Sequence, residues 1–282
     1  MFESIGRSIE LVKTSWAILM DDKKLLVFPI LSGLVTLLVL LTFALPLLFA
    51  GMVMGLATAG SGIFFLILFA FYAVSYFIVI FFNTALISCV NARLNGTEMS
   101  VGEGLTHASR HLPSIFVWAL ISATIGLILH LFERRAGILG RIAGAIVGGV
   151  WSLLTFFVVP VLVLEDKGVL DSVKESVSLI KRTWGESIVG SGSILLIFVA
   201  IGFVAILAVL GTLAFGNMVV FGTALALFLI LIVVLAVVAL AMQGIFVTAL
   251  YTYARTGTVP TAFSRELIEH AFVQRQAGPG NI

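Results

Sequence analysis

Residues 218–250 read MVVFGTALALFLILIVVLAVVALAMQGIFVTAL and contain no Asp, Glu, Lys or Arg. An α-helix rises about 1.5 Å per residue, so about 20 apolar residues cross the hydrocarbon layer of a bilayer. The stretch is therefore long enough to span a membrane as a helix. Five more uncharged runs lie upstream, at residues 25–50, 63–90, 114–132, 142–164 and 187–214. The sequence predicts an all-α, polytopic integral membrane bundle with six transmembrane helices, and only residues 215–217 separate the last two.

The overall composition points to the same class of protein. Of the 282 residues, 61% are hydrophobic and 11% are charged, whereas an ordinary soluble protein has about 25% charged residues. So few charges cannot solvate the surface of a soluble domain, which excludes a soluble enzyme and a disordered chain. The net charge of +2 is too small to indicate a polyanionic partner, so no nucleic-acid binding is expected.

The basic residues indicate how the predicted spans are oriented. If six spans alternate from a cytoplasmic N-terminus, all but three of the 16 Lys and Arg residues fall on the cytoplasmic side. Because positive charge is enriched in cytoplasmic loops, both termini are predicted to be cytoplasmic. The sequence thus predicts a multi-pass protein of the plasma (cytoplasmic) membrane.

Three arginines are the exceptions to this charge rule, and they cluster in one outer hairpin: Arg134, Arg135 and Arg141. Guanidinium groups pair well with anionic groups, so these residues are candidate contacts for an anionic lipid headgroup or ligand. Alternatively they are solvated, and the long side chain of Arg141 reaches the outer surface. Membrane lipids are the expected partners.

A glycine-rich stretch follows within the same hairpin. Residues 137–149, GILGRIAGAIVGG, place Gly140, Gly144 and Gly148 four residues apart on one helix face. Glycine at such positions lets a neighbouring helix approach closely. The face is interpreted as tight packing inside the bundle or, alternatively, as the interface of a homo-oligomer.

Amphipathic helices are predicted on the cytoplasmic side. In residues 4–19, apolar side chains recur every three or four residues and end near Trp16, and residues 172–184 repeat this design and end at Trp184. Both tryptophans are predicted to be interfacial anchors. Capping boxes, Ser100-x-x-Glu103 and Ser172-x-x-Glu175, are expected to start two of the helices. These helices either bind anionic lipid or gate the bundle, or they only anchor it.

The two amphipathic segments also belong to an internal repeat. At an offset of 168 residues, five positions are identical, namely Ser4, Ser8, Leu11, Lys13 and Trp16 with Ser172, Ser176, Leu179, Lys181 and Trp184. The far ends agree as well, since Thr84-Ala85-Leu86 resembles Thr248-Ala249-Leu250, and Gly96-Thr97 resembles Gly257-Thr258. Each copy holds two spans, an even number, so both copies enter the membrane from the same side and the repeat is parallel.

This duplication predicts the organisation of the chain. Residues 1–282 form a single membrane domain. Within it, repeat 1 covers residues 1–111, an inserted transmembrane hairpin covers 112–165, repeat 2 covers 166–275, and 276–282 are a tail.

Residues 158–184, VVPVLVLEDKGVLDSVKESVSLIKRTW, carry a family resemblance. The pattern consists of Pro160, Glu165, Gly168, Ser172, Ser176, Leu179 and Trp184. It resembles a superfamily of polytopic proteins of unknown function that includes the membrane domain attached to some glycerophosphodiester phosphodiesterases. Residues 15–32 are similar to one uncharacterised branch. The resemblance implies a membrane fold with duplicated halves and supplies no catalytic residues.

The sequence contains few groups that could carry out catalysis or bind a metal. His107 and His111 are four residues apart and could pair at one metal, but we favour a solvated interfacial face as their explanation. We therefore predict no catalytic residue, no metal site and no cofactor. The favoured function is a non-catalytic membrane protein that organises lipid or a partner protein. The alternative is a carrier or channel for a small or lipid-like molecule between the repeats, and a lipid-modifying enzyme is the least favoured.

Overall fold

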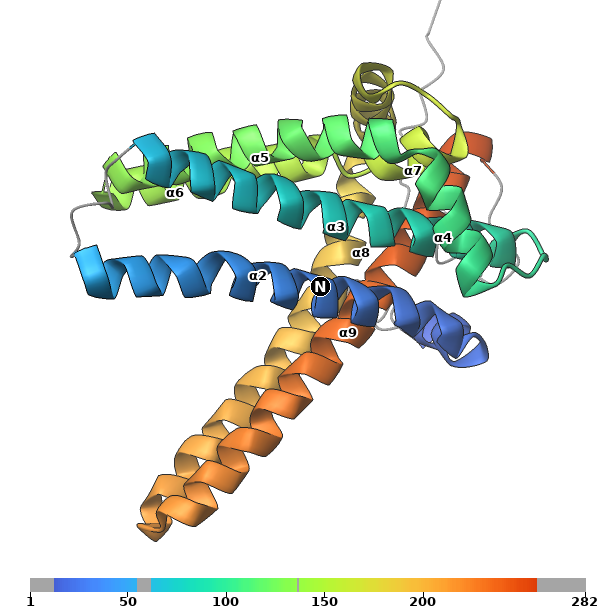
Figure 1. Cartoon of the computed structure of the whole chain (residues 1–282). Coiled ribbons are helices and arrows are strands. Elements are labelled where there is room, and N and C mark those ends of the chain that lie inside the picture. Colours follow the sequence, from blue (N-terminus) through green and yellow to red (C-terminus); the bar gives the residue numbers. More distant parts are fainter. Residues whose placement is uncertain (1–12, 55–61, 136, 258–282) are drawn as a thin grey trace, which may run out of the picture. The chain divides into compact units, whose positions relative to one another are not determined.

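The computed structural model describes residues 13–54, 62–135 and 137–257 (Figure 1). Within these ranges every regular element is helical, which confirms the predicted all-α class. A helix over residues 13–21 comes first. The labelled helices are α2 (Val27–Met54), α3 (Gly62–Leu94), α4 (Val101–Arg110), α5 (Leu112–Arg135), α6 (Gly137–Leu154), α7 (Val158–Leu164), α8 (Val169–Gly211) and α9 (Met218–Thr256). Two 3-10 helices, η1 (Lys23–Leu26) and η3 (Thr212–Phe215), precede α2 and α9.

Six helical stretches are long and apolar enough to cross a membrane. They are Lys23–Pro46, Gly62–Leu94, Leu112–Phe132, Gly140–Leu164, Ile194–Gly211 and Met218–Thr256. Each overlaps one uncharged run of the sequence, so the chain is a multi-pass membrane protein with the predicted six spans. The agreement follows from the length rule, because a helix must match the thickness of the hydrocarbon layer.

The chain divides into two compact units. The central unit consists of residues 23–178, and the terminal unit combines residues 1–22 with 179–282. The long helix α8 therefore begins in the central unit and continues in the terminal unit. Each unit is described by itself below.

Helix α3 is the centre of the central unit, where it packs against α2, α4, α5 and α7 (Figure 1). Pairs of aromatic rings pack between helices of this unit. Phe43 of α2 meets Phe71 of α3 edge to face at 5.7 Å, and Trp118 of α5 stacks on Trp151 of α6 at 5.9 Å. The shared core is apolar and holds Ile80, Ile115, Trp118, Ala119, Val158, Leu162, Val163 and Val169.

The fourth span is interrupted between α6 and α7. Helix α6 ends at Leu154, α7 begins at Val158, and Pro160 in the first turn of α7 has no N–H to donate. The fully buried Ser176 of α8 supplies the missing partners. Its hydroxyl donates to the carbonyl oxygen of Leu154 at 2.7 Å and accepts from the N–H of Phe157 at 3.1 Å. This is necessary because an unpaired backbone group is costly inside a membrane.

In the terminal unit, α8 and α9 form the predicted tight hairpin. Gly216 adopts the left-handed conformation, with φ 61°, and ends η3. Asn217 then caps α9, because its side-chain oxygen accepts from Val219 N–H at 2.9 Å. A Cβ atom at Gly202 of α8 would lie 3.2 Å from Ile232 Cδ1 of α9, so the helices are in close contact there.

The structure corrects one predicted helix start. Helix α8 begins at Val169, three residues before Ser172, so the capping box Ser172-x-x-Glu175 is wrong. Ser172 is inside the first turn, and its hydroxyl donates to the carbonyl oxygen of Gly168 at 3.0 Å. The box at Ser100 is confirmed, with reciprocal bonds between Ser100 and Glu103.

The interfacial segments are described only in part. Residues 4–12 and the side chain of Trp184 lie outside the described residues. Trp16 is 45% exposed on the helix over residues 13–21, while Leu19 on the same helix is buried. The internal repeat of residues 1–111 and 166–275 stays a prediction.

Candidate functional site

Polar side chains collect at one end of the central unit. Helix α3 ends at Leu94, and α5 begins at Leu112 after the short helix α4, while α7 ends at Leu164. The segments that follow α3 and α7 therefore meet at the same end of the bundle, where α4 and α7 lie in Figure 1. Because the spans stop at these residues, the end lies at the boundary of the hydrocarbon layer.

Helix α4 is fixed on this end by its cap and by a close contact. The Glu103 carboxylate accepts from the N–H of Ser100 at 2.7 Å, and this bond lowers the pKa of Glu103. On the opposite face, a Cβ atom at Gly104 would lie 2.5 Å from Cys89 Sγ and 3.2 Å from the backbone oxygen of Ala85. Only glycine lets α4 approach α3 so closely.

His107 connects α4 to α3 through a serine. The hydroxyl of Ser88 donates to the carbonyl oxygen of Thr84 at 2.9 Å and lies 3.1 Å from His107 Nδ1. A hydroxyl has one hydrogen, so when Ser88 donates it to Thr84 it accepts from His107, and this arrangement corresponds to the neutral tautomer with its proton on Nδ1. Burial, together with the positive charges of His111 and Arg110, lowers the pKa of His107, although Asp166 opposes this. In that tautomer Nε2 is unprotonated.

His111 connects the same end to the α7–α8 loop. Its Nδ1 lies 3.4 Å from Oδ1 of Asp166, whose backbone is left-handed with φ 51°. The rings of His107 and His111 are 5.1 Å apart. No group of three His, Cys, Asp or Glu side chains that could hold a metal occurs among the described residues. The two histidines instead have different hydrogen-bond partners.

A lysine organises the α7–α8 loop. Lys167 Nζ lies 2.7 Å from Glu165 Oε2 and 3.3 Å from Glu175 Oε2. The bond to Glu165 is the main cause of the raised pKa of Lys167. The ion pairs therefore connect the loop that follows the fourth span to the first turns of α8.

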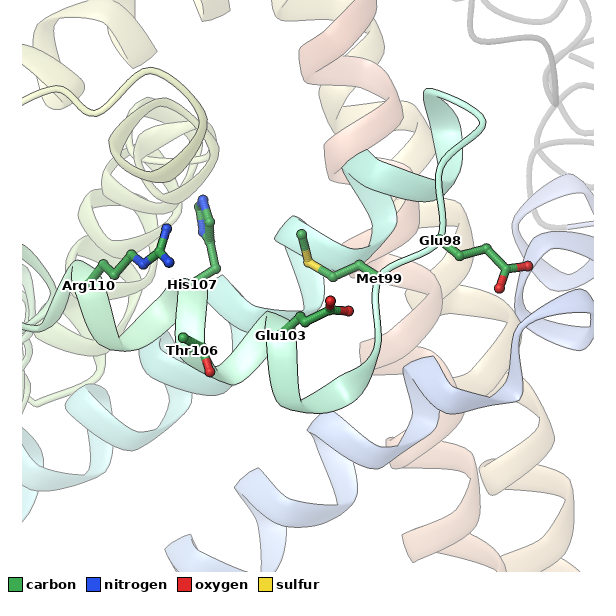
Figure 2. A pocket seen from close by; sticks show the side chains of 6 residues that line it. All are labelled: Glu98, Met99, Glu103, Thr106, His107 and Arg110. Carbon is green, nitrogen blue, oxygen red and sulfur yellow. The ribbon is translucent and has the colours of Figure 1, made fainter.

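An open pocket of about 270 Å³ lies on the outer face of α4 (Figure 2). Its lining consists of Glu98, Met99, Glu103, Thr106, His107 and Arg110. In Figure 2, His107 and Arg110 point to the same side of α4, Met99 lies beside Glu103, and Glu98 lies at the far edge. The pocket thus offers a carboxylate at the start of α4 and a guanidinium at its end.

The residues singled out from the sequence lie elsewhere, on α5 and α6. Gly140 and Gly144 are buried, and a Cβ atom at Gly148 would lie 3.6 Å from Leu129 Cδ1 of α5. Helix α5 therefore covers at least part of the glycine face. Arg141 is exposed. The side chains of Arg134 and Arg135 lie outside the described residues.

Sequence reasoning missed the roles of Ser88, Ser176 and Arg110. The sequence signal for the role of Ser176 was Pro160, because a helix break before a proline leaves backbone groups of the span without helical partners. Ser88 and His107 are 19 residues apart, and no local pattern joins them. Arg110 was counted only as one more cytoplasmic charge.

Comparison with known proteins identifies a family but no function. No curated protein shows significant similarity to the chain. A protein-family profile matches residues 62–261, from the start of α3 to beyond the end of α9. Because the match covers more than half of the chain, the protein belongs to this family, which is described as a family of unknown function (DUF6159).

Proposed function

We propose that the protein is a non-catalytic membrane protein that organises lipid, or a partner protein, in the bilayer. The observation that carries this proposal is the apolar core of the central unit. Where α3, α5 and α7 meet, a cluster of apolar side chains is buried, and Ile115, Val158 and Leu162 in it are essentially inaccessible. A polar solute has no favourable path through such a core.

The hydroxyl groups of the spans support the same proposal. Each of several Ser and Thr side chains donates to a carbonyl oxygen of its own helix four residues earlier. These pairs are Thr42 with Leu38, Ser88 with Thr84, Thr124 with Leu120, Thr155 with Trp151, Thr223 with Val219 and Thr248 with Gly244. Hydroxyls used in this way satisfy themselves locally and do not line a transport path.

Several finer parts of the proposal rest on the sequence. Both termini are cytoplasmic and the membrane is the plasma membrane, as the distribution of Lys and Arg favours. Residues 1–111 and 166–275 are copies of one unit. The resemblance to the membrane domain of glycerophosphodiester phosphodiesterases agrees with a membrane part that lacks catalytic groups of its own.

Two surface features extend the proposal. Arg141, with Arg134 and Arg135, is a contact for anionic lipid at the outer face. If Arg141→Gln leaves the amount of co-purified anionic lipid unchanged, that part is wrong. The face of Gly140, Gly144 and Gly148 serves packing against α5, and a homo-oligomer through it is the alternative.

Native mass spectrometry of the full chain in mild detergent tests the function. We expect peaks with bound phospholipid, and the same spectrum reports the number of subunits. Protein-containing liposomes test the alternative of a carrier or channel, because they should release trapped small solutes no faster than empty liposomes. A protein that retains no lipid and no partner, or that releases solute rapidly, contradicts the proposal.

A further inference from the structure

The pocket on α4 lies at the depth of lipid headgroups. The second span ends at Leu94 and the third begins at Leu112, and every lining residue falls between them. Directly after α4, the first turns of α5 expose Phe116 and Val117, by 53% and 46%. A polar pocket thus lies next to an apolar, accessible helix surface, which is the arrangement that one phospholipid molecule needs.

The charges of the pocket are ordered along α4. Glu103, Thr106, His107 and Arg110 recur at three- and four-residue spacing and share one helix face. Arg110 follows Glu103 by seven positions, which corresponds to about 10.5 Å along the axis. The capping bond holds Glu103 through Oε2 and does not involve Oε1. A ligand that lies along this face meets negative charge at one end and positive charge at the other.

His107 adds a hydrogen-bond acceptor between the two charges. Its Nδ1–H is committed to Ser88, and the lowered pKa keeps the ring neutral at pH 7. The unprotonated Nε2 can therefore accept from an ammonium N–H. No Trp, Tyr or Phe is among the residues that line the pocket, so it has no aromatic cage for a quaternary ammonium.

From this arrangement we infer that the α4 pocket binds the phosphoethanolamine headgroup of a phospholipid. The ammonium group donates to Glu103 and to His107 Nε2, and Arg110 binds the phosphate. A choline headgroup has no N–H to donate and leaves both acceptors unpaired, so it is discriminated against. This inference rests on the proposed function, because it names the lipid that the protein organises.

Competition among lipids in native mass spectrometry tests the inference. The full chain in mild detergent receives equal amounts of phosphatidylethanolamine, phosphatidylcholine and phosphatidylglycerol with identical acyl chains. We expect the protein to retain about ten times more of the ethanolamine lipid than of the choline lipid, because one charge-assisted hydrogen bond accounts for a difference in affinity of that size. Soluble phosphoethanolamine in excess should compete only weakly, since it lacks the acyl chains; complete displacement by it would assign the site to a free metabolite instead.

Two substitutions test the binding of the ammonium group and of the phosphate separately. Glu103→Gln keeps the capping box, because Gln also serves at that position, and should reduce the preference for ethanolamine over choline, since His107 Nε2 remains as an acceptor. Arg110→Gln should reduce retention of both lipids and leave their ratio unchanged. Lys174→Gln, an exposed lysine on α8 outside the pocket, is the matched control and should change neither quantity.

The outcomes distinguish this inference from the function on which it rests. Equal retention of ethanolamine and choline lipids by the unaltered protein overturns the inference and leaves a lipid organiser without a selective pocket. An unchanged lipid ratio in Glu103→Gln overturns it as well. Absence of any retained lipid contradicts the proposed function itself.

Discussion

Helices α3 and α9 are the matched second spans of the two predicted repeats, and their C-terminal ends have the same local structure. Thr84-Ala85-Leu86 and Thr248-Ala249-Leu250 are all buried. One turn later, the hydroxyls of Ser88 and Thr252 donate to Thr84 O and Thr248 O, each at 2.9 Å. Within these short stretches the two helices therefore share burial and hydrogen bonding, while the internal repeat itself stays a prediction.

Both helices are followed by a glycine with positive φ. Gly96 follows α3 with φ 75°, and Gly257 caps α9 with φ 69°. At Gly96 the chain closes a Schellman motif, since Thr97 N–H donates to Ala92 O at 2.9 Å and Gly96 N–H donates to Arg93 O at 3.1 Å. At Gly257 a single bond, from its N–H to Tyr253 O at 2.8 Å, ends α9.

The helices differ in what covers their middle parts. Within the central unit, α3 contacts α2, α5 and α7, and α5 belongs to the hairpin of residues 112–165 that the sequence predicts to be inserted. Within the terminal unit, α9 exposes Leu227, Ile230 and Val233 by about 60% each. Each unit therefore treats its long span differently, with the middle of α3 packed and this face of α9 open.

The largest effect is expected where α4 and α3 are in closest contact. Gly104→Leu forces a side chain into Cys89 and Ala85 and should destabilise the protein by about 3 kcal/mol or more. On α9, a Cβ atom at Gly222 would meet no other atom within 4 Å, so Gly222→Leu should be neutral. Thermal melting in detergent measures both. Equal melting temperatures would break the contrast between a packed α3 and an open α9.

The second effect concerns α7, which packs on α3. Ser176→Ala removes the hydroxyl that donates to Leu154 O and accepts from Phe157 N–H and should cost about 2 kcal/mol. Ser172→Ala is the matched control, because the carbonyl of Gly168 still accepts from the N–H of residue 172 at 2.9 Å. Melting temperatures of the two equally buried serine variants should differ clearly. A similar loss in both would mean that the bridge of Ser176 is not needed.

The third effect tests the equivalence of the helix ends. Gly96→Ala and Gly257→Ala each place a side chain at positive φ and should each cost about 1 kcal/mol. Neither position has a neighbour within 4 Å, so backbone strain alone decides the result. Gly222→Ala near the start of α9 is the control and should be neutral or slightly stabilising. Strongly unequal losses at the two ends would count against matched copies.

The smallest effect is a dependence on pH. The fold lowers the pKa of His107, so the unfolded chain takes up a proton first as the pH falls. The folded state should therefore lose stability below about pH 6.5 and be unaffected by this group above it. His107→Gln should flatten this part of the curve of melting temperature against pH. An unchanged slope would show that other groups cause the dependence.

The sequence predicts local features well and distant contacts poorly. The absence of charge located all six spans, and Gly216 with Asn217 marked the hairpin because turn chemistry is local. The box at Ser100 was right, while the box at Ser172 failed because α8 starts earlier, at Val169.

The polar end of the bundle depends on pairs that are far apart in sequence. His111 and Asp166 are brought together by the packing of α5 and α7 on α3, and Ser176 reaches Leu154 across the break between helices. Periodicity describes one helix at a time, so it cannot predict such pairs. The residues that line the pocket on α4 are close in sequence, but periodicity does not show that their side chains enclose a pocket.

Accessibility of a spin label on α9 tests the central claim most directly. The label is placed by Leu229→Cys in a Cys89→Ala background, in liposomes, and compared with a label at Ile80, a core residue of α3. Leu229 is 57% exposed and Ile80 is buried. The account predicts that oxygen, which partitions into lipid, relaxes the label on α9 strongly, whereas a water-soluble nickel complex does not. Strong relaxation by the nickel complex, or protection equal to that at Ile80, would contradict a span whose apolar face is covered by lipid.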